Sequence, residues 1–291
     1  MPLVSLKEIL DGANNGNRAV PAFDAVDHAS AEAVVQAAEA KNMPVIVMLP
    51  EAAFPLVDVD AFMDYLVFLT KKSKVPVALH LDHGQTLEAV MKSIGHGFTS
   101  VMIDGSSLPL DQNIALAKKI TELAHSAGVS VEAELGHVGG DEGGFDGHEG
   151  CEDLYTKTEE AKEFVDATNV DALAVAIGTV HGIYKGTPKL DLDRLRKIKA
   201  TVGIPLVLHG GSGLTDDDFV GAIRAGINKV NLFTEISMSA LARSVEYVKE
   251  RGNKLHFAEM VLAGRRTVFE SASRYLDLFA LKNGTSGGNG F

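Results

Sequence analysis

Short apolar runs alternate with amphipathic stretches along most of the chain, and this alternation restricts the possible folds more than any other feature. Eight runs rich in Val, Ile and Leu are predicted strands, and they start near Ala19, Pro44, Val75, Thr99, Ser130, Asp171, Ile204 and Asn228. Several runs have no polar alternation, which is typical of parallel strands covered on both faces. Eight such strands alternating with helical patterns predict an α/β fold, the (β/α)8 or TIM barrel.

A single barrel domain is expected over residues 1–281, because no linker-like segment or shift in composition divides the chain of 291 residues. Two helices, Glu235–Arg251 and Ala258–Leu281, are predicted to follow the eighth strand as a C-terminal helical extension. The last stretch, Lys282–Phe291, is rich in Gly, Ser and Asn, and we expect it to be a flexible tail.

The charge balance and the cysteine content exclude several kinds of partner and environment. The chain has 39 acidic and 27 basic residues and a net charge of −12, and such a surface repels nucleic acid and anionic lipid. Its single cysteine, Cys151, allows no intrachain disulfide and agrees with a reducing compartment. No apolar run approaches the ~20 residues of a membrane span, and the N-terminus lacks a signal-peptide pattern. We therefore expect a cytoplasmic protein that binds neither nucleic acid nor membranes.

One connection, residues 136–155, is longer than its counterparts and contains seven glycines and six acidic residues. It has no apolar periodicity, so a packed helix is not expected there. Long glycine-rich loops of barrels are active-site lids or disordered segments. Because this loop leaves the end of the barrel where catalysis occurs, we favour a lid.

Polar residues gather at the carboxyl ends of the predicted strands, where barrels of this class carry their catalytic groups. They are Asp24, Asp82, His83, Asp104, Glu134, His181, His209 and Asn231. Any one of them alone is explained by contact with water, but so many at one rim predict an active site, since buried polar groups need partners. Three of them are histidines from different strands, which is the ligand set of a catalytic zinc site with an open fourth position.

A glycine-rich turn, His209–Gly213, follows the seventh predicted strand and precedes a helix. Glycines let backbone N–H groups approach an anion, and the N-terminus of a helix adds a favourable dipole. Such turns are common, so this one is a weak signal by itself. Barrels often bind phosphate after their seventh and eighth strands, and the turn together with residues 231–234 therefore predicts a phosphate site.

Five motifs together resemble those of the class II, zinc-dependent fructose-bisphosphate and tagatose-bisphosphate aldolases. They are HLDHG at 80–84, SVMID at 100–104, VEAELG at 131–136, VHG at 180–182 and LHGGSG at 208–213. The resemblance runs from about residue 2 to 280, with the motifs in order on the expected strands. It implies an aldehyde-lyase of carbohydrate metabolism, as in glycolysis, that reversibly cleaves a ketose (bis)phosphate into dihydroxyacetone phosphate and an aldehyde.

The resemblance also implies roles for single residues. His83, His181 and His209 would hold the catalytic zinc ion (Zn2+), which would polarise the ketose carbonyl. Asp82 would donate the proton to the aldehyde oxygen during condensation, and Glu142 in the long loop would move the carbon-bound proton. Asp104 and Glu134 match a second divalent metal position of some members, and their alternative role is support of the histidines.

Substrate contacts follow from the same comparison. The phosphate of dihydroxyacetone phosphate would lie against Gly182, Lys185, Gly210, Gly211, Ser212, Asn231, Leu232, Phe233 and Thr234, beside a monovalent cation (Na+ or K+). In many members an arginine from a second subunit binds the distal phosphate, and Arg265 is the candidate here, ahead of Arg266. A solvated helix face is the alternative role for either arginine. The family's assemblies imply a homodimer or homotetramer.

Two departures from the family pattern concern the aldehyde half of the substrate. Asp24 stands where fructose-bisphosphate members have Asn, and Phe233 stands where Asn, Asp, Ala or His is usual. A carboxylate only accepts hydrogen bonds, and an apolar ring makes none. An aldolase acting on a non-bisphosphate or unusual sugar phosphate is therefore an alternative. A metal-dependent hydrolase or isomerase on the same barrel is another, because a fold does not fix its chemistry.

Overall fold

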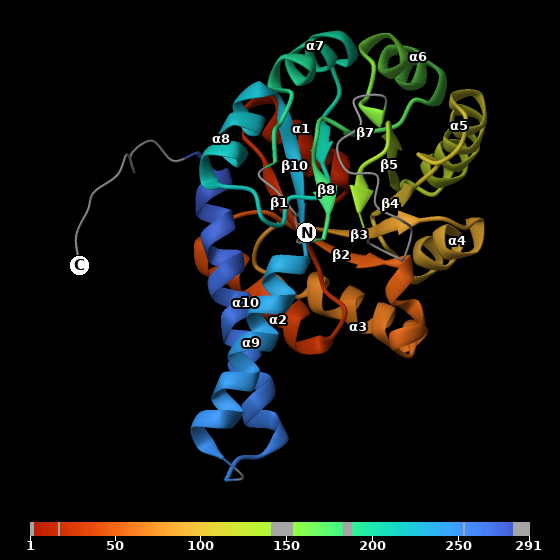
Figure 1. Cartoon of the computed structure of the whole chain (residues 1–291). Coiled ribbons are helices and arrows are strands. Elements are labelled where there is room, and N and C mark those ends of the chain that lie inside the picture. The colour runs from red at the N-terminus through yellow and green to blue at the C-terminus, as the bar shows by residue number, and fades with distance from the viewer. Residues whose placement is uncertain (1–2, 17, 141–153, 183–187, 253, 282–291) are drawn as a thin grey trace.

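The computed structural model describes residues 3–16, 18–140, 154–182, 188–252 and 254–281, and its strands form a closed parallel barrel (Figure 1). The barrel strands are β1 (Val20–Asp24), β2 (Val45–Pro50), β3 (Val77–Gly84), β4 (Ser100–Ile103), β5 (Ser130–Leu135), β7 (Ala172–Val175), β9 (Leu206–Leu208) and β10 (Ile227–Leu232). They lie around the barrel in chain order, and β10 closes the ring against β1. The predicted (β/α)8 barrel is therefore confirmed.

Helices surround this ring and cover its outer face, and one further helix, α1 (Leu6–Asn15), precedes the first strand (Figure 1). The surrounding helices are α2 (His28–Lys41), α3 (Val59–Lys71), α4 (Leu87–His96), α5 (Leu110–Ser126), α6 (Thr158–Thr168), α7 (Leu192–Val202) and α8 (Asp216–Ala225), with a 3-10 helix, η1, at Glu51–Leu56. Side chains of Asp27, Thr86, Asp191 and Thr215 cap the N-termini of four of them. These caps fix where the loops at the carboxyl ends of the strands begin their helices.

The predicted C-terminal extension is confirmed as two antiparallel helices, α9 (Thr234–Arg251) and α10 (Phe257–Phe279). Figure 1 shows that α10 packs beside α2, and that α9 and α10 together project well beyond the barrel. The expected tail at residues 282–291 lies outside the described residues. None of the described helices is long and apolar enough to cross a lipid bilayer.

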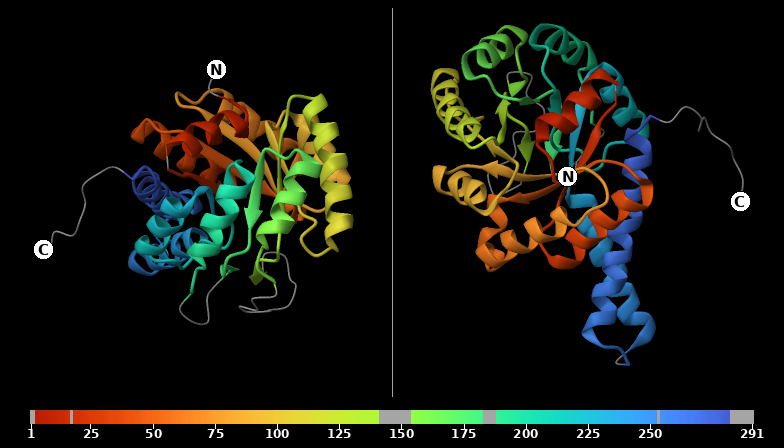
Figure 2. Two further views of the ribbon diagram at one scale, coloured as in Figure 1. Left: turned by 90° about the horizontal axis from the view of Figure 1, so that it is seen from above. Right: turned by 180° about the vertical axis from the view of Figure 1, so that it is seen from behind.

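Two separate apolar cores hold the barrel together. The larger lies between the strands and the surrounding helices, and the smaller lies inside the barrel. Leu6 and Leu10 of α1 are fully buried against this inner core. Figure 2 shows α1, in red, lying across the end of the barrel at which the strands begin. Because α1 closes the N-terminal end with apolar side chains, the opposite end is the one left for polar groups.

The interior becomes polar toward the carboxyl ends of the strands. Side chains two residues apart share one face of a strand, and three strands use this spacing to place two polar residues each. The pairs are His80 and Asp82 on β3, Glu132 and Glu134 on β5, and Lys229 and Asn231 on β10. All six are buried. They form a lower and an upper polar layer, and the upper one lies at the barrel mouth.

A bulge at the end of β3 shapes this mouth. From Leu81 to Gly84, three steps along β3 match two steps along β4, so β3 contains one extra residue. Bulges bend a strand and change the direction of its side chains. His83 sits in the bulge with a φ of 42°, a left-handed conformation that residues other than glycine rarely adopt and that costs free energy. The strain therefore falls on a predicted metal ligand.

Two short strands were not predicted from the sequence. β6 (Gly139–Gly140) and β8 (Val180–His181) pair in parallel outside the barrel sheet. His181 was expected to close the sixth barrel strand, but that strand, β7, ends at Val175. The apolar run at 171–177 concealed this early end. His181 is held by pairing with the start of the long loop instead, so the position of this histidine depends on the loop.

Gly84→Ala is expected to destabilise the fold, because the added methyl group would collide with the carbonyl oxygen of Met102 on β4. Overpacking of this kind costs ~1–3 kcal/mol, and urea unfolding of the metal-free chain measures the loss. The matched control is Gly12→Ala, at an exposed position of α1 where nothing lies within 4 Å of an added Cβ. It is expected to stabilise the chain by ~0.5–1 kcal/mol. Equal free energies of unfolding for the two variants would contradict tight packing at the bulge.

Candidate metal centre and active site

Three histidines from separate segments meet at the barrel mouth. His83 comes from β3, His181 from β8, and His209 follows the last residue of β9. Their ring centroids are 4.6 Å apart for His83 and His209, 5.0 Å for His83 and His181, and 5.8 Å for His181 and His209. One nitrogen of each ring lies within 4.8 Å of those of the other two. This spacing suits a single metal ion held by three imidazoles.

Two carboxylates hold the outer nitrogens of two of these rings. Nδ1 of His83 lies 2.9 Å from Oδ2 of Asp104, and Nε2 of His209 lies 2.9 Å from Oε1 of Glu132. An ionised carboxylate only accepts hydrogen bonds, so each ring donates its outer N–H to its carboxylate. Carboxylates in this position fix the ring orientation and the tautomer of metal-binding histidines.

This tautomer assignment leaves two acceptor nitrogens facing each other. Nε2 of His83 and Nδ1 of His209 are 2.8 Å apart, and both rings have placed their N–H on the opposite side. Two lone pairs at this distance repel unless a proton or a metal ion lies between them. The donor set therefore fits a cation, and the three nitrogens of neutral imidazole character fit a transition metal.

The charges around the cluster favour one positive charge within it. Burial by itself lowers the pKa of His83, but the charge of Asp82 and the hydrogen bond to Asp104 outweigh burial and hold this pKa well above its usual value. Burial, together with the charge of His83, holds the pKa values of His181 and His209 well below their usual value. Burial raises the pKa of Asp104, but its hydrogen bond to His83 and the charge of that ring hold it below its usual range.

Asp104 and Glu134 reach the same cluster from the other side. With His83 they form a second group whose ligand atoms lie within 4.8 Å of one another. Burial, and next the charge of Asp104, raise the pKa of Glu134 to about 8. The backbone N–H of Val138, the residue directly before β6, donates to Oε1 of Glu134. The geometry accommodates both expected roles of Asp104 and Glu134, a second divalent site and support of the histidines.

Asp82 lies completely buried beside the histidines. Its Oδ1 accepts a hydrogen bond of 2.9 Å from Nδ2 of Asn231 on β10, and its Oδ2 has no hydrogen-bond partner in the part of the chain that the structure describes. Glu51 of η1 fixes the loop after β3, because it accepts hydrogen bonds from the backbone N–H groups of Gln85 and Thr86. Asp82 thus projects a carboxylate oxygen from a rigid backbone.

The predicted anion site is brought together by close backbone contacts. A Cβ on Gly210 would collide with the backbone of Val180, and one on Gly211 would lie 2.9 Å from the carbonyl oxygen of Asn231. The glycine turn therefore packs between β8 and β10. Oγ of Ser212 accepts a 3.3 Å hydrogen bond from the backbone N–H of Glu235, in the first turn of α9. The turn, the start of α9 and Gly182 after β8 line one corner of the barrel mouth.

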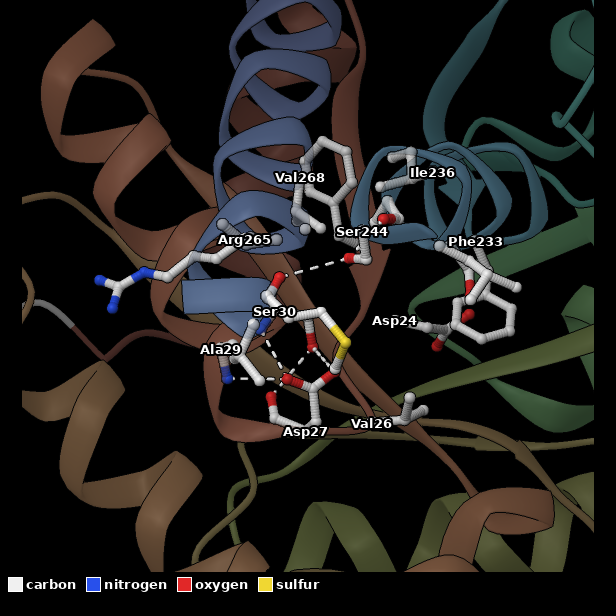
Figure 3. Close-up of a pocket in the computed structure, with 18 of the residues that line it drawn as sticks. Asp24, Val26, Asp27, Ala29, Ser30, Phe233, Ile236, Ser244, Arg265 and Val268 are labelled. Atoms are coloured by element: carbon white, nitrogen blue, oxygen red, sulfur yellow. Dashed lines mark hydrogen bonds between the residues drawn. The ribbon is translucent and has the colours of Figure 1, made fainter. Parts of the chain in front are cut away.

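The residues expected for the aldehyde half lie beside this corner. A pocket of about 570 Å³ between the barrel mouth, α2, α9 and α10 is lined by Asp24, Phe233 and Arg265, among others (Figure 3). The guanidinium of Arg265 extends away from Asp24 and Phe233 (Figure 3) and pairs with Glu32 of α2 at 2.6 Å. Arg266 is highly exposed and pairs with Glu270 on its own helix. Of the two arginines, Arg265 is therefore the one at the pocket.

Sequence reasoning assigned no role to Glu132 and Lys229 of the lower polar layer, and it expected the third member, His80, to pack in its strand or to orient a neighbour. Each side chain is fully buried, and Glu132 contacts a predicted metal ligand directly. The signal was present, because each residue lies two positions before a strand-end residue that was recognised. Glu142 and Lys185, for which roles were expected, lie outside the described residues.

Comparison with known proteins assigns the family. The family model for class-II fructose-bisphosphate aldolase matches residues 4–284. The chain belongs to the class-II fructose-bisphosphate aldolase family. Members of this family are aldolases, hence lyases that act on small sugar phosphates, and are typically metal-dependent. The histidine cluster of this chain could hold such a metal ion.

Solved structures agree with this assignment. The YdjI aldolase from Escherichia coli K12 is 32% identical, with a TM-score of 0.85 over 95% of this chain and 97% of that one. A putative fructose-1,6-bisphosphate aldolase from Coccidioides immitis is 28% identical, with a TM-score of 0.84 over 94% and 95% of the two chains. A fructose-bisphosphate aldolase from Campylobacter jejuni is 24% identical, with a TM-score of 0.80 over 95% of each chain, and it supports the fold alone.

His181→Ala is expected to abolish tight binding of a divalent transition metal, because it removes one of three ligands and leaves the other two with incomplete coordination. Metal content after dialysis, measured by mass spectrometry, checks this result. The matched control is His125→Ala, which removes a partly exposed histidine that pairs with Asp171 and lies outside the cluster. This control is expected to keep the metal content of the unaltered chain. Equal metal content in His181→Ala and the control would contradict the site.

Proposed function

We propose that this chain is a zinc-dependent class II aldolase that reversibly cleaves a ketose phosphate into dihydroxyacetone phosphate and an aldehyde. The observation that carries the proposal is the pair of facing imidazole nitrogens of His83 and His209, 2.8 Å apart, with the buried carboxylate of Asp82 beside them. Family membership over residues 4–284 supports the reaction type. Zinc bound by His83, His181 and His209 supplies a Lewis acid for a ketose carbonyl.

The protons in the cleavage direction are assigned to two carboxylates. Asp82 removes the proton of the hydroxyl group on C4 while the bond between C3 and C4 breaks, and the aldehyde forms from C4. Glu142 then gives a proton to C3, which completes dihydroxyacetone phosphate. After cleavage Asp82 releases its proton to water and Glu142 takes one up from water, so each carboxylate returns to its starting state, and in condensation both transfers run in reverse. The hydrogen bond from Asn231 supports this role, because it orients Asp82 without occupying its second oxygen.

The phosphate of dihydroxyacetone phosphate is assigned to the corner formed by Gly182, Gly210, Gly211, Ser212 and the segment from Asn231 to Thr234, which joins the end of β10 to the start of α9. Backbone N–H groups at a glycine turn and a helix N-terminus bind phosphate without a basic side chain. Lys185 and a monovalent cation are further contacts in this proposal. The site thus binds an anion although the chain has a net charge of −12.

A second substrate candidate, an aldehyde without a distal phosphate, is favoured by the pocket beside the barrel mouth. Asp24 brings a carboxylate there and repels a phosphate, while Phe233 removes a hydrogen-bonding group. The guanidinium of Arg265 pairs with Glu32 within the same chain. Arg265→Ala, assayed on ketoses with and without a distal phosphate, separates the two candidates. If Arg265 binds the distal phosphate, the variant loses activity on the bisphosphate and keeps its activity on the ketose without that phosphate.

A panel of ketose phosphates, with both C4 epimers of the bisphosphate, tests the proposed reaction. We expect release of dihydroxyacetone phosphate that stops with a metal chelator and returns with zinc. Asp82→Asn is expected to lower kcat by ~10²–10⁴-fold, the usual contribution of a general acid–base group, while His125→Ala keeps the full rate. If no ketose phosphate of the panel yields dihydroxyacetone phosphate in a chelator-sensitive way, the proposal fails.

Proton exchange distinguishes an aldolase from a hydrolase or isomerase on the same barrel. An aldolase exchanges one C3 proton of dihydroxyacetone phosphate with deuterium from solvent in the absence of aldehyde, and this exchange requires Glu142 in the proposal. Glu142→Ala therefore serves as the control in the same NMR assay. Exchange that is equally fast in the variant would remove the assigned role of Glu142.

The partner expected at the projecting helices is a second copy of this chain, giving a homodimer or homotetramer. One face of α9 exposes Met238, Leu241, Val245 and Val248, with exposed fractions of 36% to 64%. Their spacing of three, four and three residues makes a continuous apolar stripe, and Leu241, Val245 and Val248 also line the open pocket. A twofold axis beside α9 would place the apolar stripe of one subunit against the same stripe of the other. Helix α9 of the partner subunit would then cover the apolar pocket.

Leu241→Asp combined with Val245→Asp is expected to convert the assembly to monomers, because it places two charges in a buried apolar contact. Sedimentation velocity over a concentration series measures the change. The matched control is Leu123→Asp on α5, a similarly exposed leucine at 37% on a helix that lies away from the projecting pair (Figure 1). A monomeric unaltered chain, or the same assembly in the double variant, would contradict this interface.

A further inference from the structure

The lower polar layer of the barrel contains an ion pair that the proposed reaction does not use. Nζ of Lys229 on β10 lies 2.8 Å from Oε2 of Glu132 on β5, and both side chains have an exposed fraction of 0%. The other carboxylate oxygen, Oε1, accepts the hydrogen bond from Nε2 of His209 at 2.9 Å. Nε2 of His80 lies 3.7 Å from Oε2, and Nδ1 of His80 lies 2.6 Å from the hydroxyl of Ser100. Glu132 therefore links a buried cation to a predicted metal ligand.

Packing does not explain this ion pair. Removing two charges from water is expensive, and apolar residues of similar volume are often as stabilising or more so. The register partners of Glu132 on the two flanking strands are buried and apolar, Met102 on β4 and Ala172 on β7. Nζ of Lys229 makes no hydrogen bond to any other group in the described residues. Its contact is the carboxylate of Glu132, so its effect on the site acts through that residue.

The contact between Glu132 and His209 decides which nitrogen of this ring faces the other histidines. A carboxylate accepts the N–H at Nε2 and so leaves the lone pair on Nδ1, the nitrogen that faces His83. Nζ of Lys229, 2.8 Å from Oε2, holds the carboxylate in the orientation in which Oε1 meets Nε2 of His209.

We propose that Glu132 and Lys229 are positioning residues, which together hold His209 in the tautomer that presents Nδ1 to the metal. Lys229 acts two contacts away from the ion, through Glu132 and then His209. The inference rests on the proposed metal site, and it assigns a role to two residues that touch neither substrate nor metal. A purely structural ion pair would contribute to folding but would not affect the tautomer of His209.

Three variants separate the two roles: Glu132→Gln, Lys229→Met, and the double variant Glu132→Met with Lys229→Met. Each is tested for zinc affinity by competition with a chromophoric chelator, and for stability by urea unfolding of the metal-free chain. Glu132→Gln and Lys229→Met are each expected to weaken zinc binding 10–100-fold, the usual effect of losing such a supporting group. Lys229→Met also lowers stability, because it leaves a buried carboxylate without its counter-charge.

The double variant gives the decisive comparison, because it replaces the ion pair with apolar side chains. Its stability is expected to recover, while its zinc affinity stays reduced, since no carboxylate holds Nε2 of His209. Nitrogen-15 NMR of the histidine rings is expected to report an Nε2–H tautomer for His209 in the unaltered chain and loss of that preference in the variants. Met102→Leu on the neighbouring strand is the matched control for an altered interior and is expected to change neither property.

Two results would overturn the inference. One is zinc affinity that is unchanged in Glu132→Gln and Lys229→Met. The other is affinity that returns together with stability in the double variant. If Lys229→Met does not fold, Glu132→Gln and the double variant decide between the same outcomes. Failure of the unaltered chain to bind zinc tightly would overturn the proposed function and this inference with it, whereas tight binding that the variants do not alter would overturn the inference alone.

Discussion

The exclusion of water from the barrel interior is the constraint on which the site depends. Once α1 has closed the N-terminal end with apolar side chains, every charge inside must find its partner within the protein. Two ion pairs provide such partners, Glu132 with Lys229 in the interior and His83 with Asp104 at the partly exposed mouth. Each pair contains a carboxylate that accepts a hydrogen bond from a histidine of the cluster. The carboxylates that balance the buried positive charges therefore also orient the predicted metal ligands. Stability and ligand geometry are coupled for this reason.

Backbone shape supplies what side-chain pairing cannot. The bulge in β3 places Asp82 and His83 side by side at the mouth, one bonded to Asn231 and the other to Asp104, although consecutive residues of a regular strand point to opposite faces. The bulge forces His83 into a left-handed backbone conformation, which costs free energy. It also requires a glycine at position 84, because only a residue without Cβ allows β3 to approach β4 so closely. The glycine turn at 210–211 uses the same means on the opposite side, where it packs against Val180 and Asn231.

The sequence was sufficient for the barrel, for the C-terminal helices and for the residues at the strand ends, because periodicity and strand termini are local properties. It was insufficient where a contact joins strands that are distant in the chain. The two-residue spacing is enough to place the side chains of Glu132, Lys229 and His80 on the interior face of their strands. Nothing in the local sequence indicates that Lys229 of β10 reaches Glu132 of β5 across the barrel. His181 was assigned to a barrel strand because the apolar run at 171–177 conceals the end of β7, and only its pairing with β6 shows where it lies.

The two halves of the proposed site are built from different parts of the fold, and this division bears on specificity. The predicted metal ligands and Asp82 come from β3, β8 and the end of β9, where Asp104, Glu132 and Asn231 hold the side chains of His83, His209 and Asp82. The aldehyde side is formed by Asp24, Phe233 and the pocket between α2, α9 and α10, whose lining is mostly apolar. Substitutions there leave the ion pairs of the interior intact, since none of these residues takes part in them. A barrel with this arrangement can therefore change its aldehyde partner while it keeps its metal chemistry.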